Sequence, residues 1–330
     1  MDTIRVGING FGRIGRRLFR LLLEQEGIEV VAINDPADPN TLAHLLKYDS
    51  IHGVLTKEVK VENGVLYVDG QPSTMTQQIH PEQIEWPELD VVVESSGKFK
   101  DRISLEGHLR GQVKRVILSV PPISEDIPMI VKGVNDQILP ADPIISNASC
   151  TTNSAAPMVQ VIDQLCGIEQ CYITTVHSYT TDQSLHDQPH RDLRRARAAG
   201  QSMVPTTTGA AKALTRIFPQ HAQAIGGCGI RVPVANGSLT DITFNVKREV
   251  TIAEVNEAFK KASQGSLQGV LEYTQDPIVS VDVIGNSHSC VFDSGMTSVI
   301  GRMVKVIGWY DNETGYSSRI IDLIDDLSRK

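Results

Sequence analysis

The sequence lacks the cysteine patterns of disulfide-rich and zinc-binding proteins. It has five cysteines in 330 residues, and no two of them form a C-x-x-C pair. An odd number without such pairs disfavours a disulfide framework or a structural zinc site. We therefore expect no bound metal and a reducing, cytoplasmic setting.

Long apolar runs and an excess of positive charge are also missing. No run approaches the roughly 20 apolar residues of a transmembrane helix, and residues 1–5 lack the apolar core of a signal peptide. The formal net charge is −8. The one basic stretch, 190–197, is short, contains an acid and has no aromatic residue. We expect neither a membrane nor a nucleic acid as a main partner.

The composition that remains is typical of a globular protein. Hydrophobic residues make up 41% of the chain and charged residues 21%. A chain of 330 residues exceeds what one hydrophobic core usually organises, so we expect two domains.

The first half opens with a strand, a glycine-rich turn and a helix. Residues 4–8 predict a strand, 9–15 a turn, 16–25 a helix and 29–33 a second strand. This order is typical of dinucleotide-binding domains. A turn that merely contains glycines is the alternative, but the flanking elements favour cofactor binding.

Each position of the turn has a mechanical role in that interpretation. Gly10 permits the tight turn, Gly12 lets the backbone approach a pyrophosphate, and Gly15 lets the helix pack on the sheet. Amides near Arg13 and Ile14 would bind the phosphates at a helix N-terminus.

An acid follows the second strand at the expected distance. Asp35 lies 20 positions after Gly15, where an acid reaches a ribose 2′-hydroxyl. Since a carboxylate would repel a 2′-phosphate, Asp35 favours NAD over NADP. Further strands alternate with helices and predict a parallel α/β Rossmann sheet. They cover 59–61 and 65–68, a hairpin around Asn63-Gly64, and 91–94, 116–119 and 144–146.

A candidate nucleophile follows the last of these strands. Cys150 precedes a helical pattern over 151–165, which Gly167 ends. A thiol at a helix N-terminus is expected to have a lowered pKa. His177, at the end of the strand 171–176, is a candidate base, although a buried structural histidine is the alternative. The other four cysteines are interpreted as structural.

The rest of the chain predicts an α+β domain with a mixed sheet. Thr251 to Glu254 is a capping box that opens a helix to about residue 264. Strands are expected over 239–246, 279–283 and 303–309, and a final helix after Gly315.

Six motifs then resemble glyceraldehyde-3-phosphate dehydrogenases, in order and along essentially the whole chain. They are INGFGRIG at 8–15, ASCTTN at 148–153, TTVHSYT at 174–180, TGAAKA at 208–213, RVPVAN at 231–236 and WYDNETGY at 309–316. The resemblance implies a glycolytic oxidoreductase that oxidises glyceraldehyde 3-phosphate to 1,3-bisphosphoglycerate with NAD and inorganic phosphate. Cys150 would carry a thiohemiacetal and then a thioester, and His177 would accept the thiol proton.

The resemblance also assigns binding residues. For the cofactor it adds Ser96, Ser119 and Asn312, the last to hold the nicotinamide carboxamide. Hydroxyls, amides and guanidinium groups suit the two phosphates. Thr180, Asp182 and Arg231 match the pocket for the substrate phosphate, with Arg195 nearby, and Ser149, Thr151, Thr208 and Gly209 match the pocket for the attacking phosphate. A helix cap at Thr208 and a surface ion pair at Arg231 are the structural alternatives.

Domains and assembly follow from the same resemblance. It implies an NAD-binding domain over 1–149, onto which a helix over 315–330 packs, and a catalytic domain over 150–314 with a long loop at about 178–203. A homotetramer is expected. Gln188 stands where NAD-specific bacterial members often have Leu, so the resemblance leaves NADP use open while Asp35 opposes it.

Two alternative functions remain beside this one. Erythrose-4-phosphate dehydrogenases share the stretches 43–49 and 190–205, but usually lack the intact TTTGAAKA and HSYT elements that are present here. A non-catalytic RNA-binding or protein-binding role is the other alternative, and the intact set of site residues argues against it.

Overall fold

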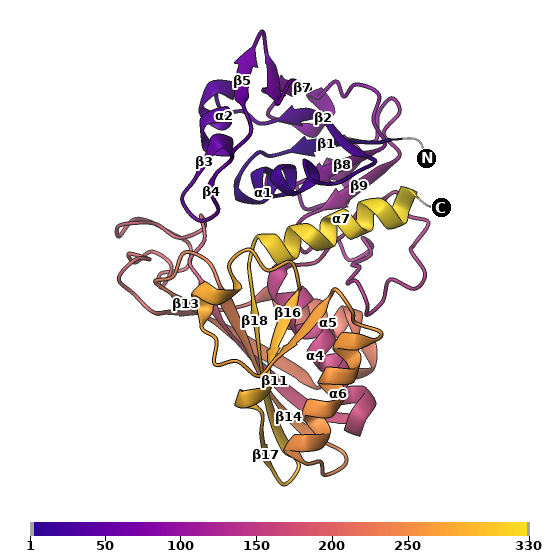
Figure 1. The fold of residues 1–330 in the computed structure, drawn as a ribbon, viewed down its shortest axis with the longest axis vertical. Coiled ribbons are helices and arrows are strands. Elements are labelled where there is room, and N and C mark those ends of the chain that lie inside the picture. The colour runs from indigo at the N-terminus through magenta and orange to yellow at the C-terminus, as the bar shows by residue number, and fades with distance from the viewer. Residues whose placement is uncertain (1–2, 329–330) are drawn as a thin grey trace. The chain divides into compact units, whose positions relative to one another are not determined.

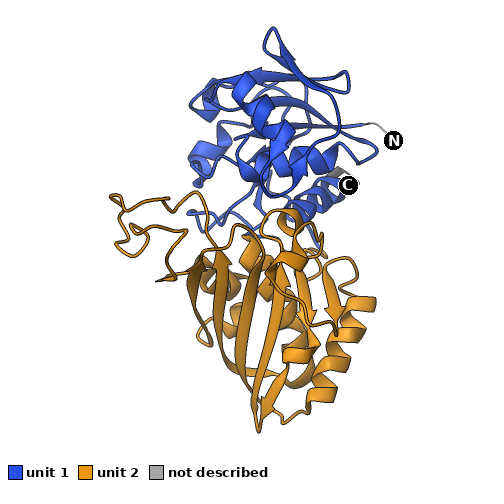
Figure 2. Cartoon of the chain, turned by 60° about the vertical axis from the view of Figure 1, so that its left-hand side comes forward, with its two compact units in different colours: residues 1–130, 138–148, 317–330 blue, residues 131–137, 149–316 orange. Residues whose placement is uncertain are grey.

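A computed structural model of the chain describes residues 3–328 (Figure 1). Contacts divide them into two compact units, shown in Figure 2. The first unit takes its described residues from 1–130, 138–148 and 317–330, and the second contains 131–137 and 149–316.

The first unit is built on an eight-stranded sheet with the order β10-β9-β8-β1-β2-β7-β6-β5. From β10 to β7 neighbouring strands are parallel, and β6 and β5 extend the sheet as an antiparallel hairpin. This confirms the predicted α/β Rossmann class. The strands are β1 Ile4–Asn9, β2 Ile28–Asn34, β5 Val59–Glu62, β6 Val65–Val68, β7 Gln71–Thr76, β8 Val91–Glu94, β9 Arg115–Leu118 and β10 Ile144–Ser146.

The predicted hairpin is confirmed between β5 and β6. Its two turn residues, Asn63 and Gly64, have φ angles of 50° and 75°. Both lie in the left-handed region, which Asn and Gly adopt most readily, and such turns match the twist of paired strands.

Helix α1, Arg13–Leu22, follows β1 and begins three residues earlier than its apolar pattern predicted. Leu18, Phe19 and Leu22 are buried on its inner face. The remaining elements of this unit are α2 Pro39–Lys47, β3 Tyr48–Asp49, β4 Gly53–Val54, η1 Pro81–Gln83, α3 Arg102–Glu106 and, from residue 317 on, α7 Thr314–Ser328. Residues 329–330 of the helix predicted over 315–330 lie outside the described residues.

The second unit has a mixed sheet with the order β12-β13-β11-β14-β18-β16-β15, and β17 pairs with β18. The pairs β11/β13 and β15/β16 are parallel and the others antiparallel, as predicted for a mixed sheet. The strands are β11 Ile168–Ser178, β12 Val204–Thr206, β13 Ile225–Val232, β14 Ser238–Val246, β15 Leu271–Thr274, β16 Cys290–Asp293, β17 Ser298–Ile300 and β18 Met303–Tyr310.

Three helices pack on this sheet: α4 Cys150–Cys166, α5 Gly209–Ile217 and α6 Ile252–Gln264 (Figure 1). Packing of α4 on β18 is so close that a Cβ at Gly308 would lie 2.9 Å from the sulfur of Met158. The predicted end of α4 at Gly167 is confirmed, with φ 67°. The predicted capping box of α6 is also confirmed, because Thr251 and Glu254 cap each other's backbone.

One predicted strand is wrong. Residues 279–283 were expected to be extended, but Ser280–Val283 forms a short 3₁₀ helix, η3. Its start is fixed locally, because the carboxylate of Asp282 accepts a hydrogen bond of 2.7 Å from the amide of Val279. The other short 3₁₀ helices are η2 Pro219–His221 and η4 Ser294–Met296.

The segment 131–137 belongs to the second unit, which the sequence did not indicate. A Cβ at Gly133 would lie 2.8 Å from Cδ2 of Leu267, so this backbone packs directly on the second unit's core. Within residues 3–328, no helix has the length and apolarity needed to cross a bilayer.

Candidate active site and cofactor site

The candidate nucleophile, Cys150, is the first residue of α4. Ser149 caps this helix, since its hydroxyl accepts a hydrogen bond of 3.1 Å from the amide of Thr152. Ala148, just before, has φ 53°, an uncommon left-handed conformation for a residue with a side chain. A strained turn and a side-chain cap thus fix Cys150 at a helix N-terminus.

The structure brings His177 to this thiol. Nε2 of His177 lies 3.6 Å from Sγ of Cys150. Nδ1 of the same ring lies 2.7 Å from the carbonyl oxygen of Ser178, to which only a protonated nitrogen can donate. The carbonyl contact calls for a proton on Nδ1, although the guanidinium of Arg231, which can only donate, also contacts this nitrogen. With the proton on Nδ1, the lone pair of Nε2 faces both the Cys150 thiol and Nδ2 of Asn312 and can accept a proton.

Asn312 is hydrogen-bonded to the same ring. Its Nδ2 lies 3.2 Å from Nε2 of His177. Its Oδ1 accepts hydrogen bonds from the hydroxyls of Ser178, at 3.0 Å, and Ser238, at 2.9 Å. Its Nδ2 also donates a hydrogen bond of 2.6 Å to the hydroxyl of Ser238. In this structure Asn312 therefore helps to hold the histidine.

Burial sets the protonation of both reacting groups. It lowers the pKa of His177 to about 3, with the charge of Arg231 acting in the same direction. The imidazole is therefore neutral at physiological pH. Burial also raises the pKa of the Cys150 thiol, and the opposing effects of Arg231, Thr151 and Asn312 are smaller. The lowered thiol pKa expected from the sequence is wrong, because desolvation outweighs the helix N-terminus here.

Arg231, on β13, lies beside this pair. It is the parallel-strand partner of His177. Its guanidinium donates a hydrogen bond of 3.0 Å to the carbonyl of Ser178 and also contacts Nδ1 of His177. Among the described residues, no carboxylate lies within ion-pair distance of Arg231, so the surface ion pair considered above is not formed. An uncompensated cation beside a nucleophile is a natural site for an anionic substrate.

The other residues predicted for the substrate phosphate lie partly in this neighbourhood. The charges of Arg195 and Asp182 both act on the pKa of Arg231. Arg195 pairs with Asp182, and its Nε donates a hydrogen bond of 2.9 Å to the hydroxyl of Thr206. Thr180 accepts a backbone hydrogen bond from Gln183. Two arginines of the predicted basic stretch, Arg195 and Arg197, are thus paired with acids of the same loop.

The residues predicted for the attacking phosphate lie at the N-termini of α4 and α5. Thr208 caps α5, accepting a hydrogen bond of 3.2 Å from the amide of Ala210. A Cβ at Gly209 would meet nothing within 4 Å. The cap considered above is therefore present, and it coexists with open space for an anion. In the described part of the chain, no hydrogen bond links Thr208 or Gly209 to the Cys150–His177 pair.

Three residues of this site were missed from the sequence: Ser178, Ser238 and Tyr310. The hydroxyl of Tyr310 lies 2.9 Å from that of Thr151 and 3.0 Å from that of Thr175. Ser238 occupies an inward, buried position of the alternating strand β14. A polar residue at a position that should be apolar was the signal that could have identified it.

The first unit holds the residues predicted for the cofactor. Gly10 has φ 89°, and a Cβ there would lie 2.3 Å from the amide nitrogen of Ser96. A Cβ at Gly15 would lie 2.2 Å from the carbonyl oxygen of Gly10. A Cβ at Gly12 would meet nothing within 4 Å. Two glycines are thus required by packing, whereas Gly12 leaves the open space that a closely approaching pyrophosphate needs.

Asp35, directly after β2, is fixed by backbone amides. Its carboxylate accepts hydrogen bonds of 2.8 Å from the amide of Phe11 and 2.9 Å from that of Ala37. Helix α1 begins nearby without an acid in its first turn, and the Arg13 side chain is bound to Asp49 at 2.7 Å. Backbone amides near Arg13 and Ile14 are therefore the groups available to phosphates. This donor set fits a dinucleotide.

Ser96 and Ser119 both contact Glu94 at the end of β8. The hydroxyl of Ser96 donates a hydrogen bond of 2.5 Å to the Glu94 carboxylate. The amide of Ser119 donates one of 2.9 Å to the Glu94 carbonyl. Both serines thus lie at the carboxyl end of the parallel sheet, where ligands of such folds bind.

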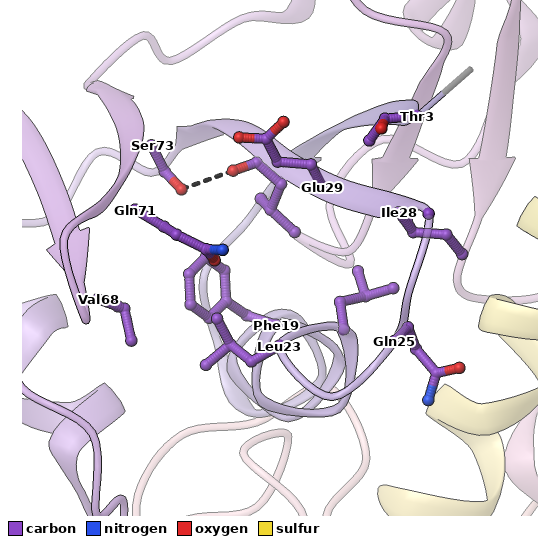
Figure 3. Close-up of a pocket in the computed structure, with 12 residues that line it drawn as sticks. Thr3, Phe19, Leu23, Gln25, Ile28, Glu29, Val68, Gln71 and Ser73 are labelled. Atoms are coloured by element: carbon purple, nitrogen blue, oxygen red, sulfur yellow. Dashed lines mark hydrogen bonds between the residues drawn. The ribbon is translucent and has the colours of Figure 1, made fainter. Parts of the chain in front are cut away.

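A separate pocket of the first unit contains none of these residues. Figure 3 shows it between the end of α1, the start of β2 and the strands β6 and β7, with Phe19, Leu23 and Val68 among its walls.

Potential metal ligands are not clustered in the described residues. Within residues 3–328, no group of three or more His, Cys, Asp or Glu side chains could hold a metal ion.

Comparison with known proteins agrees with both units. Residues 4–102 match the family model for the glyceraldehyde 3-phosphate dehydrogenase NAD-binding domain, and 149–312 match that for its C-terminal domain. The chain is 54% identical to glyceraldehyde-3-phosphate dehydrogenase 2 of Streptomyces avermitilis, with 97% of each chain covered. It is 50% identical to the glyceraldehyde-3-phosphate dehydrogenase of Geobacillus stearothermophilus and 48% identical to that of Mycobacterium avium, with 99% and 98% of each chain covered. The chain therefore belongs to the glyceraldehyde-3-phosphate dehydrogenase family and is an NAD-dependent dehydrogenase.

Proposed function

We propose that this enzyme oxidises glyceraldehyde 3-phosphate, with NAD and inorganic phosphate, to 1,3-bisphosphoglycerate through a covalent intermediate on Cys150. The observation that carries the proposal is the Cys150 thiol, 3.6 Å from Nε2 of a neutral His177 and close to the guanidinium of Arg231, which has no carboxylate within ion-pair distance among residues 3–328. A nucleophile, a base and an anion site in one place suit a phosphorylated aldehyde.

The chain's own groups supply the proton and covalent steps. His177 accepts the thiol proton at Nε2 while Cys150 Sγ bonds to the aldehyde carbon, giving a thiohemiacetal. The backbone amide of Cys150, at the start of α4, is a donor for the negative charge that develops on the substrate oxygen. Bound NAD supplies the acceptor for the hydride that leaves this carbon. A thioester on Cys150 results.

Inorganic phosphate then completes the reaction. Its oxygen bonds to the thioester carbon, the C–S bond breaks, and Cys150 recovers its proton from His177. We assign the substrate phosphate to Arg231, Thr180, Asp182 and Arg195, and the attacking phosphate to Ser149, Thr151, Thr208 and Gly209. Capped helix N-termini at Ser149 and Thr208 support the second assignment.

Replacing Arg231 by Gln tests the substrate phosphate site. We expect kcat/KM for glyceraldehyde 3-phosphate to fall about 10- to 100-fold, since a charge-assisted hydrogen bond is lost. For unphosphorylated glyceraldehyde, kcat/KM should fall much less. Arg197→Gln is the matched control, because Arg197 is exposed and pairs with Asp187 at 2.9 Å. Equal losses for both aldehydes would mean that Arg231 acts on the Cys150–His177 pair and not on the phosphate.

Replacing Asp35 by Gly tests the choice of cofactor. The Asp35 carboxylate would bind the ribose hydroxyl of NAD and repel the 2′-phosphate of NADP. We expect the dissociation constant of NADP divided by that of NAD to fall by about tenfold or more. Asp38→Asn is the control, since Asp38 lies nearby and caps α2. An unchanged ratio in Asp35→Gly would show that the Asp35 carboxylate does not bind the ribose.

A cytoplasmic homotetramer without nucleic acid as its main partner completes the proposal. The family resemblance supports it. Light scattering of the purified enzyme would measure the mass, and a monomer would contradict this part of the proposal.

A further inference from the structure

A buried carboxylate lies between the central strands of the first unit. Glu94 is 0% exposed and ends β8, where it is the strand partner of Asn9 at the end of β1. Strand β1 pairs with β2 on one side and β8 on the other, so the order of the parallel strands reverses at this point. Ligands of such sheets bind outside the carboxyl ends of the strands at the reversal.

Four donors surround the Glu94 carboxylate. Its Oε1 accepts hydrogen bonds from the amide of Ser96, at 2.8 Å, and from its hydroxyl, at 2.5 Å. Its Oε2 accepts from Nδ2 of Asn9 at 2.5 Å and lies 3.1 Å from Nε2 of His108. His108 is also 0% exposed. Burying a carboxylate is costly, and this full set of donors is what makes it tolerable.

The direction of these hydrogen bonds is fixed on the histidine side. The indole nitrogen of Trp86, which can only donate, lies 3.3 Å from Nδ1 of His108. Nδ1 is therefore the acceptor, and the ring donates its Nε2 proton to Glu94.

The direction is fixed on the other side as well. Nδ2 of Asn34 donates a hydrogen bond of 3.0 Å to the backbone carbonyl of Gln78, and Oδ1 of Asn34 accepts one of 2.8 Å from the backbone amide of Gln78. These two hydrogen bonds fix which end of the Asn34 side chain is the NH₂ group. It donates to Oδ1 of Asn9 at 2.8 Å. Asn9 must then present its NH₂ group to Glu94. Every neighbour thus offers a proton to Glu94, and only a group with two acceptor oxygens satisfies them all.

Each linked strand end leads directly into a nucleotide-binding segment. Asn9 precedes the glycine turn, Asn34 precedes Asp35, and Glu94 precedes the serines 95 and 96. The hydroxyl of Ser95 also donates a hydrogen bond of 2.7 Å to the carbonyl of Gly10, which joins two of these segments. The buried network of hydrogen bonds around Glu94 therefore fixes three cofactor-binding segments relative to one another.

We propose that Glu94 is a positioning residue for the NAD site, which holds the glycine turn, Asp35 and Ser96 in their binding arrangement through Asn9, Asn34 and His108. The proposal rests on NAD binding by this unit and is independent of the chemistry at Cys150.

Glu94→Gln is the direct test. In this variant an NH₂ group replaces one carboxylate oxygen and faces two hydrogen-bond donors. The three cofactor-binding segments must therefore shift. We expect the NAD dissociation constant, measured by isothermal titration calorimetry, to rise about tenfold or more. Alkylation of Cys150 in the absence of NAD should stay within about twofold. A lower unfolding temperature with an unchanged NAD dissociation constant would overturn the proposal, because Glu94 would then serve only stability.

His108 offers a matched pair of variants if Glu94→Gln does not fold. His108→Gln can still accept from Trp86 and donate to Glu94, and should bind NAD within about threefold of the parent. His108→Leu can do neither, and should weaken NAD binding about tenfold. Emission of Trp86, followed in a Trp309→Phe background, should shift only in His108→Leu. Equal NAD binding by both variants would also overturn the proposal.

Discussion

Cys150→Ser is expected to lose at least about 10⁴-fold in dehydrogenase turnover while it still binds NAD. A serine hydroxyl fits the same space at the start of α4. It is, however, a far weaker acid than a thiol, and the neutral His177, whose pKa is about 3, is a weak base. The covalent step should therefore stop, while the cofactor residues of the first unit are untouched.

Cys228→Ser is the control for this variant. Cys228 lies on β13 and is half-buried, whereas Cys166, Cys171 and Cys290 are buried. Its replacement should leave turnover within about twofold, since the change from Cys to Ser is small and no contact of Cys228 with Cys150 or His177 is proposed. Substantial NADH formation by Cys150→Ser would show that Cys150 is not the nucleophile.

His177→Asn is expected to lower turnover by about 10²- to 10⁴-fold, the usual contribution of a positioned acid–base group. Asn is close in shape to part of the imidazole ring and can still meet Ser178 and Asn312. It cannot accept the proton of Cys150. The loss should appear mainly in kcat, because no contact of His177 with a substrate phosphate is proposed.

The pH dependence of Cys150 alkylation checks the same assignment. Burial raises the pKa of the thiol, so alkylation by iodoacetamide should accelerate as pH rises. The pKa of His177 is lowered to about 3, so its protonation should add no step between about pH 5 and 8. In His177→Asn the profile should move to higher pH. An identical profile in both proteins would show that His177 is not the thiol's base.

Local patterns were sufficient to predict most elements of the fold. The hairpin at Asn63-Gly64, the end of α4 at Gly167 and the capping box at Thr251 each depend on residues within one turn or one helix end. The strand predicted over 279–283 failed for a similarly local reason, the cap that Asp282 provides. Apolar alternation alone could not indicate that cap.

The site was predictable as residue types but not as a set of interactions. The sequence motifs pointed to Cys150, His177 and Arg231, and the structure brings these three together. The pKa of the thiol depends on its burial in the folded chain and on Arg231 and Asn312, which are distant in the sequence, and no spacing in the sequence reports these effects. The contact of Asn312 with His177 joins residues 135 positions apart.

The proposed reaction is the phosphate-dependent oxidation of a triose phosphate on Cys150. The most direct test follows NADH absorbance with glyceraldehyde 3-phosphate, with and without inorganic phosphate, beside erythrose 4-phosphate and beside NADP. We predict NAD-preferring turnover of the triose that depends on phosphate. Faster, phosphate-independent turnover of erythrose 4-phosphate, or no turnover with any pair, would contradict it.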